Sequence, residues 1–278
     1  MITFVPAGGL GNRMKSIAAA IRLAKAVDDE LEVIWFQDWG LGCRFDQLFK
    51  PLGIDRVTLR EANNIDLWTR DIPRKKNFYI PWIAERLHYQ ASMDRIKASK
   101  ALYEGFDFVS WARGRNVWLA SDVYFIAQDI PDDAFDIFHP VDHLQERIRQ
   151  VTAGFGEGTT GVHIRRTDNV RATLLSPTSL FIERMKQEPD TQRFYLATDS
   201  ENVKAEMKQI FGDRIITPSD KAERGSLAGM ENALVEMYSL AATSRIIGTV
   251  ASTYSMTAAA IGKIQLEVLE AETNDLNL

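Results

Sequence analysis

The segment from His163 to Asp168 carries side chains that could bind an anion. Two arginines, Arg165 and Arg166, stand directly after a short apolar run. A guanidinium group matches the geometry of phosphate, and two arginines at a strand end are costly to bury without a counter-charge. Alternation along a strand would put His163 and Arg165 on one face. The pattern alone leaves two interpretations open: an anion site, or arginines paired with Asp168 and neighbouring carboxylates.

A second apolar run ends in the sequence Leu-Ala-Thr-Asp-Ser of residues 196–200. The carboxylate of Asp199 could accept hydrogen bonds from the N–H groups of a nucleobase. It could equally cap a helix predicted to start near Glu201, because aspartate and serine are preferred caps. The pattern alone favours the cap.

A third apolar run leads into a cluster of hydroxyl side chains that includes Ser252, Thr253 and Ser255, followed by an alanine-rich helix. A helix N-terminus with free backbone N–H groups and hydroxyls is an anion site. The alternative interpretation is a helix that is capped by a hydroxyl and packs closely through its alanines. It would explain the alanines fully and the hydroxyl cluster partly. Three such strand ends in one sheet argue for a ligand more strongly than any one of them.

Near the N-terminus, the sequence Gly-Gly-Leu-Gly-Asn-Arg of residues 8–13 opens a helix after a strand. It fails the dinucleotide fingerprint and the P-loop pattern, because Met14 stands where each requires glycine. A nicotinamide dehydrogenase and a P-loop kinase are therefore disfavoured. The loop can still present the amides of Gly9 and Gly11, with Asn12 and Arg13, to an anion between two domains.

No Asp-x-Asp pair, by which many sugar-nucleotide enzymes hold a divalent ion, occurs in the chain. Arginines can meet the charge of a diphosphate without metal. The sequence therefore favours a metal-independent transferase.

The elements that must position these residues alternate between strand and helix, which is typical of parallel sheets with crossover helices. In the second half we expect strands at 160–164, 193–197, 214–216 and 245–248, and helices at 177–187, 201–211, 232–243 and 252–261. In the first half we expect strands at 2–5, 32–36, 56–59 and 117–120, and a helix at 12–27.

These patterns predict an α/β protein of two Rossmann-like domains, 1–153 and 154–278, with a glycine-rich linker at residues 154–158. The sequence between 45 and 136 gives weaker signals.

Composition limits the function further. The net charge of −5 argues against a nucleic-acid binder. One cysteine, Cys43, excludes an internal disulfide, and the histidines lack zinc-ligand spacing. No apolar run is long enough to cross a membrane, and the N-terminus lacks the basic region of a signal peptide. We therefore expect a cytoplasmic protein without a bound metal. Peripheral contact with a membrane is compatible with this expectation.

At these motifs the chain resembles the superfamily of α-1,6-fucosyltransferases, bacterial nodulation fucosyltransferases and protein O-fucosyltransferases. Residues 161–168 match its first motif, H-x-R-R-x-D, and residues 195–199 match its second. Residues 245–255 resemble the third motif, and residues 8–13 are similar to the N-terminal glycine loop. The resemblance covers roughly residues 1–36 and 158–262.

This resemblance implies a GT-B fold with GDP-fucose in the cleft, and inverting, metal-independent transfer of fucose to a hydroxyl of a glycan or oligosaccharide. Arg165 would neutralise the leaving GDP, while His163 and Asp199 would contact guanine. The donor-binding residues that it implies are Gly9, Gly11, Asn12, Arg13, His163, Arg165, Arg166, Asp199, Ser252, Thr253 and Ser255.

The chain departs from the α-1,6 branch just after the first motif. Asn169 and Thr173 stand where that branch has a lysine and a glutamate, the latter a candidate base. Asp168 is an alternative base, although the sequence favours its orienting Arg166. The acceptor therefore stays open, and the short chain suggests a compact bacterial member. Two alternative functions also stay open: a GT-B transferase for another GDP-sugar, and a non-catalytic nucleotide-sugar-binding protein.

Overall fold

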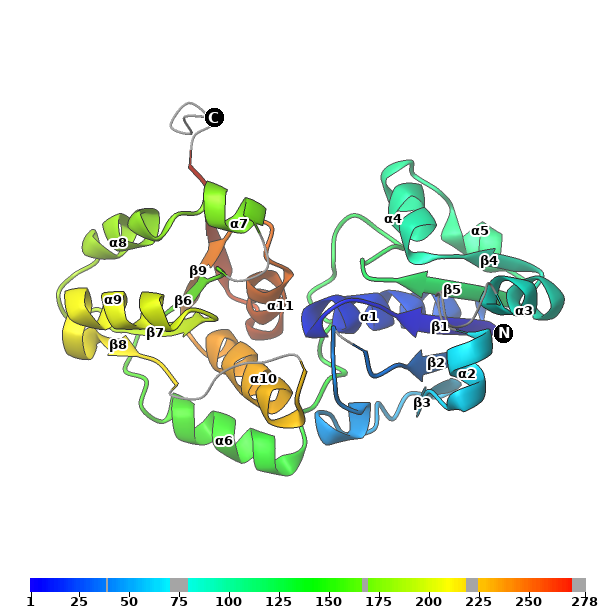
Figure 1. Ribbon diagram of the computed structural model, residues 1–278, viewed down its shortest axis with the longest axis horizontal. Helices are drawn as coiled ribbons and strands as arrows, with labels where there is room; N and C mark the ends of the chain where they lie inside the picture. The colour runs from blue at the N-terminus through cyan, green and yellow to red at the C-terminus, as the bar shows by residue number, and fades with distance from the viewer. Residues whose placement is uncertain (39, 71–79, 167–169, 219–224, 272–278) are drawn as a thin grey trace. The chain divides into compact units, whose positions relative to one another are not determined.

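The computed structural model describes residues 1–38, 40–70, 80–166, 170–218 and 225–271. The chain forms two compact units. The first comprises Met1–Val141 with a short segment that ends at Leu227, and the second comprises the rest from Asp142 onward. Each unit holds one five-stranded sheet in which all neighbouring strands are parallel (Figure 1). The two Rossmann-like halves predicted from the sequence are confirmed.

The first unit has the strand order β3-β2-β1-β5-β4. Its strands are β1 (Ile2–Pro6), β2 (Leu31–Trp35), β3 (Val57–Glu61), β4 (Ala91–Met93) and β5 (Val117–Ser121). Its helices are α1 (Leu10–Val27), η1 (Phe45–Gln47), α2 (Asn64–Thr69), α3 (Ile80–His88), α4 (Arg95–Tyr103) and α5 (Phe108–Ala112). The short helices after η1, and strand β4, were not predicted.

The second unit has the strand order β10-β9-β6-β7-β8. Its strands are β6 (Thr160–Ile164), β7 (Phe194–Thr198), β8 (Ile215–Ile216), β9 (Arg245–Thr249) and β10 (Gln265–Leu269). Its helices are α6 (Asp142–Thr152), α7 (Val170–Leu175), α8 (Thr178–Lys186), α9 (Glu201–Phe211), η2 (Gly212–Arg214), α10 (Leu227–Ala241) and α11 (Thr253–Gly262). The four strands and four helices expected here are present; α6, α7 and β10 are additional.

Helix α6 explains why the second unit starts before residue 154, where the sequence placed the domain boundary. The guanidinium of Arg147 donates a 2.6 Å hydrogen bond to the side chain of Asn232 on α10. His143 lies 3.2 Å from the carboxylate of Glu231 on the same helix. These contacts attach α6 to α10, so the glycine-rich segment 154–158 is a turn inside the second unit.

Alternation along the central strands sorts the helices of the second unit onto two faces. Val162 and Leu196 point into an apolar core with Phe181 of α8 and Met207 of α9. The intervening residues face α10 and α11. Gly161, for example, lies so close to α10 that a Cβ would come within 3.0 Å of Leu240. The face covered by α10 and α11 is the one that carries His163.

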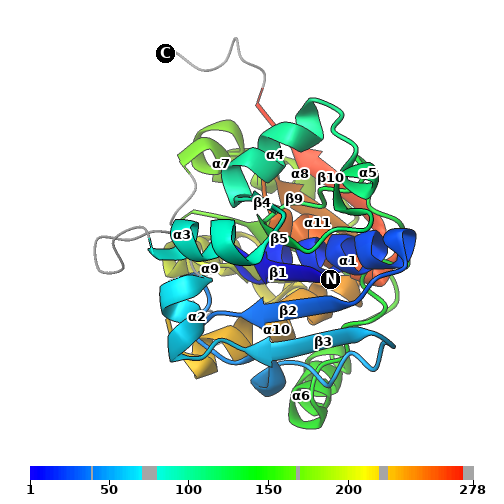
Figure 2. The same ribbon diagram turned by 90° about the vertical axis from the view of Figure 1, so that its right-hand side faces the viewer.

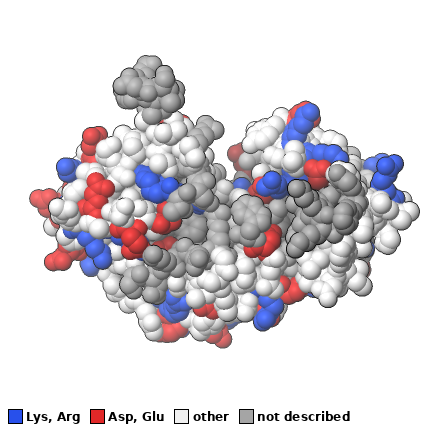
Figure 3. Space-filling view, in the orientation of Figure 1, with Lys and Arg blue, Asp and Glu red and all other residues white. Residues whose placement is uncertain are grey.

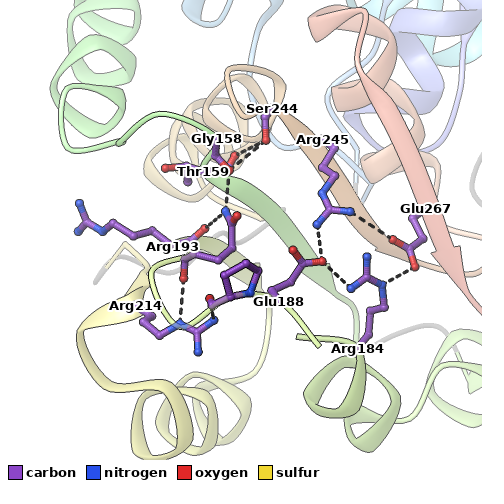
Figure 4. A network of polar contacts seen from close by, with 11 residues as sticks. Gly158, Thr159, Arg184, Glu188, Arg193, Arg214, Ser244, Arg245 and Glu267 are labelled. Carbon is purple, nitrogen blue, oxygen red and sulfur yellow. Dashed lines mark hydrogen bonds and ion pairs between the residues drawn. The ribbon is translucent and has the colours of Figure 1, made fainter. Parts of the chain in front are cut away.

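An ion-pair network ties the opposite, amino-terminal edge of this sheet together (Figure 4). The carboxylate of Glu188, just after α8, accepts hydrogen bonds from Arg184 and Arg245. Arg184 also bonds Glu267 of β10 at 2.7 Å. Burial alone would raise the pKa of Glu188, but the two arginines hold it below its ordinary value. Figure 4 shows these four side chains in one network, which joins α8, β9 and β10.

Among the residues that the structure describes, no helix has the length and apolarity needed to span a lipid bilayer.

We predict that Gly262→Ala destabilises the second unit. A Cβ at Gly262, the last residue of α11, would overlap the main-chain carbonyl of Ala241 at the end of α10. Overpacking of this kind costs about 1–3 kcal/mol, so the urea midpoint of unfolding should fall. Gly156→Ala is the matched control, because a Cβ there meets nothing within 4 Å. Equal midpoints for the two variants would contradict the prediction.

Candidate functional site

The three predicted strand ends meet at the carboxyl edge of the second sheet. Strand β6 lies between β7 and β9, with His163 beside both Ala197 and Gly248. Because all three strands are parallel, the segments that follow them emerge side by side. Ligands of open α/β sheets bind at this edge.

One threonine hydroxyl joins the segments after β6 and β9. The hydroxyl of Thr249 donates a 2.9 Å hydrogen bond to the carbonyl of His163. The same oxygen accepts a 3.2 Å bond from the backbone N–H of Arg165. The end of β6 is thereby fixed against β9, and the half-buried Arg165 follows directly.

The imidazole of His163 is buried, with 6% of the residue exposed. It stacks on the ring of Tyr254, with centroids 4.9 Å apart, and its Nδ1 lies 3.5 Å from the hydroxyl of Ser252. Burial, reinforced by the positive charge of Arg165, lowers the pKa of His163 to about 3. The ring is therefore neutral near pH 7. A neutral imidazole offers one hydrogen-bond donor and one acceptor, which suits contact with a nucleobase better than contact with a phosphate.

Arg166 supports the chain around the candidate site. Its guanidinium donates hydrogen bonds to the carbonyls of Arg165 and Ser176, at 2.7 and 2.8 Å, and to the hydroxyl of Thr178. The hydroxyl of Thr173 donates a 3.3 Å bond to the carbonyl of Arg166. These bonds give Arg166 a positioning role, and its contact with a donor stays a prediction.

Asp199 does not cap the helix that follows it. Ser200 is the N-cap of α9, and its hydroxyl accepts a 3.4 Å bond from the backbone N–H of Val203. The carboxylate of Asp199 instead accepts a 2.8 Å bond from the backbone N–H of Arg166. The sequence pattern favoured Asp199 as the helix cap, and this interpretation is wrong by one residue, because the cap is Ser200. Asp199 connects the ends of β6 and β7.

The start of α11 lies against β9 at the same edge. Ser252 is its N-cap and makes no side-chain capping bond; it is buried, as is Ser255. A Cβ at Gly248 would come within 2.9 Å of the Ser255 hydroxyl, so only glycine permits this approach. The backbone N–H groups in the first turn of a helix lack partners within the helix. With the adjoining hydroxyls, they form a candidate anion site beside Arg165.

A buried carboxyl group that the sequence reading missed lies on the same face. Glu236 of α10 is 5% exposed, and its Oε1 has no hydrogen-bond partner among the described residues. Burial raises its pKa to about 8, against the opposing charge of Lys204. The charge of Glu236 also contributes to the raised pKa of Tyr254, the residue stacked on His163. Its signal in the sequence is a single acid within the apolar run of residues 233–241.

In the first unit, the glycine loop turns at Gly8, whose φ of +79° favours glycine. Arg13, expected to reach a ligand, is fully buried under this loop. Its guanidinium bonds the carbonyls of Gly8 and Phe36, and lies 2.9 Å from the carboxylate of Asp38. Burial lowers the pKa of Arg13, and Asp38 opposes that shift. Arg13 therefore holds the loop together, and its predicted contact with a ligand stays a prediction.

The remaining predictions at this loop concern Gly9, Gly11 and Asn12. Gly9 is the N-cap of α1, and Gly11 is buried in its first turn. The side-chain oxygen of Asn12 is buried without a hydrogen-bond partner in the described part of the chain. Contact of these residues with a ligand stays a prediction.

Asp168, the candidate base, lies outside the described residues, as does Asn169. Thr253 is partly buried at the start of α11. Within the described residues, no group of three histidine, cysteine or acidic side chains is placed to hold a metal ion.

No protein-family model matches the chain, and no curated protein matches it. Solved structures do. The NodZ α-1,6-fucosyltransferase soaked with GDP-fucose matches with a TM-score of 0.67 and 17% identity, covering 100% of this chain and 97% of that one. FUT1 of Arabidopsis thaliana, a mutant in complex with GDP, matches with a TM-score of 0.66 and 15% identity, over 98% and 71% of the two chains. POFUT1 in complex with GDP-fucose matches with a TM-score of 0.62 and 10% identity, over 96% and 97%.

These similarities extend over nearly the whole chain, including residues 45–136, for which the sequence suggested no relative. At this level of identity they establish the fold. The chain has the GT-B type of fold found in these fucosyltransferases, with two Rossmann-like α/β halves, as the motifs predicted.

We predict that Glu236 makes the protein less stable as the pH rises. Its pKa is about 8 when folded, against an ordinary value of 4.5, so the folded state binds the extra proton between these values. The free energy of unfolding should therefore decrease from about pH 4.5 to pH 8. Glu236→Gln removes this ionisation, so the variant should gain stability over the wild type toward pH 8, by on the order of 1 kcal/mol or more.

Urea unfolding at pH 5 and pH 8 measures this difference. The comparison must be made between the two proteins, because Glu85 of the first unit also has a raised pKa, to about 7. Parallel pH profiles for the wild type and Glu236→Gln would rule out the assigned role of the carboxyl group.

Proposed function

We propose that this protein is a glycosyltransferase that binds GDP-fucose at the carboxyl edge of the second sheet and transfers fucose to a hydroxyl of a glycan or oligosaccharide. The observation that carries the proposal is that a group suited to a nucleobase and groups suited to an anion lie together at the carboxyl edge of the second sheet. A neutral, buried imidazole at His163 adjoins Arg165 and the start of α11. A nucleoside diphosphate needs both a base-binding and an anion-binding surface.

The diphosphate would lie against Arg165 and the first turn of α11. A guanidinium and helix N–H groups together provide charge-assisted hydrogen bonds to phosphate oxygens. Ser252, Thr253 and Ser255 add hydroxyl groups at this turn. The backbone of Arg165 is fixed by Thr249, which limits the main-chain entropy that the segment loses on binding.

The base would lie beside His163, and guanine fits the groups present. The N1–H and N2–H₂ groups of guanine form a donor pair, for which a carboxylate is the natural acceptor. Glu236 offers a buried carboxyl oxygen without a partner among the described residues, and Asp199 lies at the end of the neighbouring strand. Guanine binding would favour the ionised form of Glu236 and so lower its pKa on complex formation. The GDP and GDP-fucose complexes of the similar structures support this choice of base.

In the proposed reaction, an acceptor hydroxyl attacks C1 of fucose and the bond from C1 to the β-phosphate oxygen breaks. GDP leaves with the electron pair, and the configuration at C1 inverts. Arg165 would stabilise the charge that develops on the diphosphate, a contribution typically worth a few kcal/mol per well-placed donor. The absence of Asp-x-Asp from the sequence supports a mechanism without metal.

A group other than the side chain of Thr173 must accept the proton of the acceptor hydroxyl. Thr173 stands where the α-1,6 branch has its candidate base, and its hydroxyl bonds the carbonyl of Arg166. Asp168 is the proposed base, with late proton loss to water as the alternative. This departure also favours a second candidate function, a nucleotide-sugar-binding protein that does not turn over its ligand.

We predict that Arg165→Ala abolishes transfer and weakens GDP binding about ten- to hundredfold, because a charged hydrogen bond to phosphate is lost. Isothermal titration with GDP measures the effect. The matched control is Arg193→Ala, since Arg193 precedes β7 at the opposite edge and bonds the carbonyl of Gly154. Near-normal GDP affinity in Arg165→Ala would exclude the phosphate role.

We further predict that GDP-fucose raises the thermal midpoint more than GDP-mannose, and both more than UDP-sugars. Slow release of GDP from GDP-fucose without acceptor would support an enzyme. Tight binding with no turnover across an acceptor panel would instead support the non-catalytic alternative. A larger shift with GDP-mannose would change the proposed sugar but not the nucleotide.

A further inference from the structure

Helices α2 and α3 of the first unit expose apolar side chains on their outer surface. Of the 17 large apolar residues that are exposed in the described chain, seven lie on these two short helices. They are Ile65, Leu67, Trp68, Ile80, Trp82, Ile83 and Leu87. The two helices contact each other and lie side by side in Figure 2; their exposed apolar side chains are here named the α2/α3 patch.

The spacing of these residues gives each helix an apolar outer stripe. Ile80, Ile83 and Leu87 recur at the three- and four-residue intervals of one helix face, and Ile65 and Trp68 do so on α2. Leu87 is 77% exposed and Ile65 is 71% exposed. An exposed apolar surface of this kind marks an interaction site.

Charge on these helices is distributed in an unusual way for an acidic protein. Each helix contains one acid, Asp66 on α2 and Glu85 on α3, and both are buried. Asp66 pairs with Arg60 at 2.6 Å. The exposed ionisable residues of the two helices are Arg86 and His88. Elsewhere, acidic and basic side chains are interspersed on the surface drawn in Figure 3. In a chain of net charge −5, the described residues of α2 and α3 thus expose apolar side chains and no acid.

We propose that the α2/α3 patch binds the surface of an anionic lipid bilayer. Aliphatic side chains with two tryptophans are the residues that enter the boundary between headgroups and acyl chains. An arginine at the rim and the absence of exposed acids on these helices complement anionic headgroups. The first unit would thus associate peripherally with a membrane, and this inference does not depend on the proposed function.

Co-sedimentation with vesicles tests the proposal. The wild type should bind vesicles of phosphatidylcholine mixed with phosphatidylglycerol, and should bind pure phosphatidylcholine more weakly. The double variant Ile65→Glu/Leu87→Glu should lose at least about tenfold in partition coefficient, because two apolar side chains no longer enter the bilayer. Arg86→Glu should reduce binding to the mixed vesicles and leave binding to pure phosphatidylcholine unchanged.

The control is Ile96→Glu on α4. Ile96 is 73% exposed, but α4 also exposes Lys97 and Lys100, and Glu104 is exposed directly after the helix, which is typical of a solvated helix. This variant should bind as the wild type does, and unchanged thermal midpoints would show that all variants are folded. Failure of the wild type to bind mixed vesicles would overturn the proposal, as would equal binding by the double variant. Self-association that the double variant abolishes, without vesicle binding, would assign the patch to a second copy of the chain and also overturn it.

Discussion

The hydroxyl of Thr249 makes two hydrogen bonds to the segment after β6, one to the carbonyl of His163 and one from the N–H of Arg165. Through them the end of β9 determines where β6 stops and in which direction the chain leaves the sheet. Asp199, at the end of β7, makes a similar contact one residue later, with the N–H of Arg166. The site therefore depends on main-chain groups held by side chains from both neighbouring strands. A substitution at Thr249 would disturb His163 and Arg165 together.

The arginines near the two strand-to-helix loops differ in what surrounds them. Arg13 and Arg166 direct their guanidinium groups to carbonyls of the loops they support, and Arg13 also pairs with Asp38. Each thereby holds a segment that lies outside the regular strands. Arg165 is half-buried at the sheet edge beside a neutral histidine. Because that histidine is neutral near pH 7, the positive charge at this edge comes from the arginines and not from the imidazole.

The sequence predicted most of the second unit because its strands are apolar runs and its helices are amphipathic. It missed β10, although Gln265–Leu269 alternates polar and apolar residues, and it missed β4, because Ala91–Met93 has no β-branched residue. The strand ends identified the location of the site but not the role of each side chain. Arg13 and an arginine that binds phosphate look alike in sequence, since only tertiary contacts show whether a guanidinium already has partners. Glu236 was missed because burial, not its neighbours along the chain, sets its pKa.

The ion-pair network of Arg184, Glu188, Arg245 and Glu267 lies at the amino-terminal edge of the same sheet whose carboxyl edge carries the candidate site. On β9, Arg245 of the network begins the strand and Thr249 of the candidate site ends it. For protein engineering, this separation means that thermostability can be adjusted by redesigning one set of charges without altering the residues proposed to bind the donor. Residues at the carboxyl edge could in turn diversify toward new donors while the scaffold beneath them remains intact.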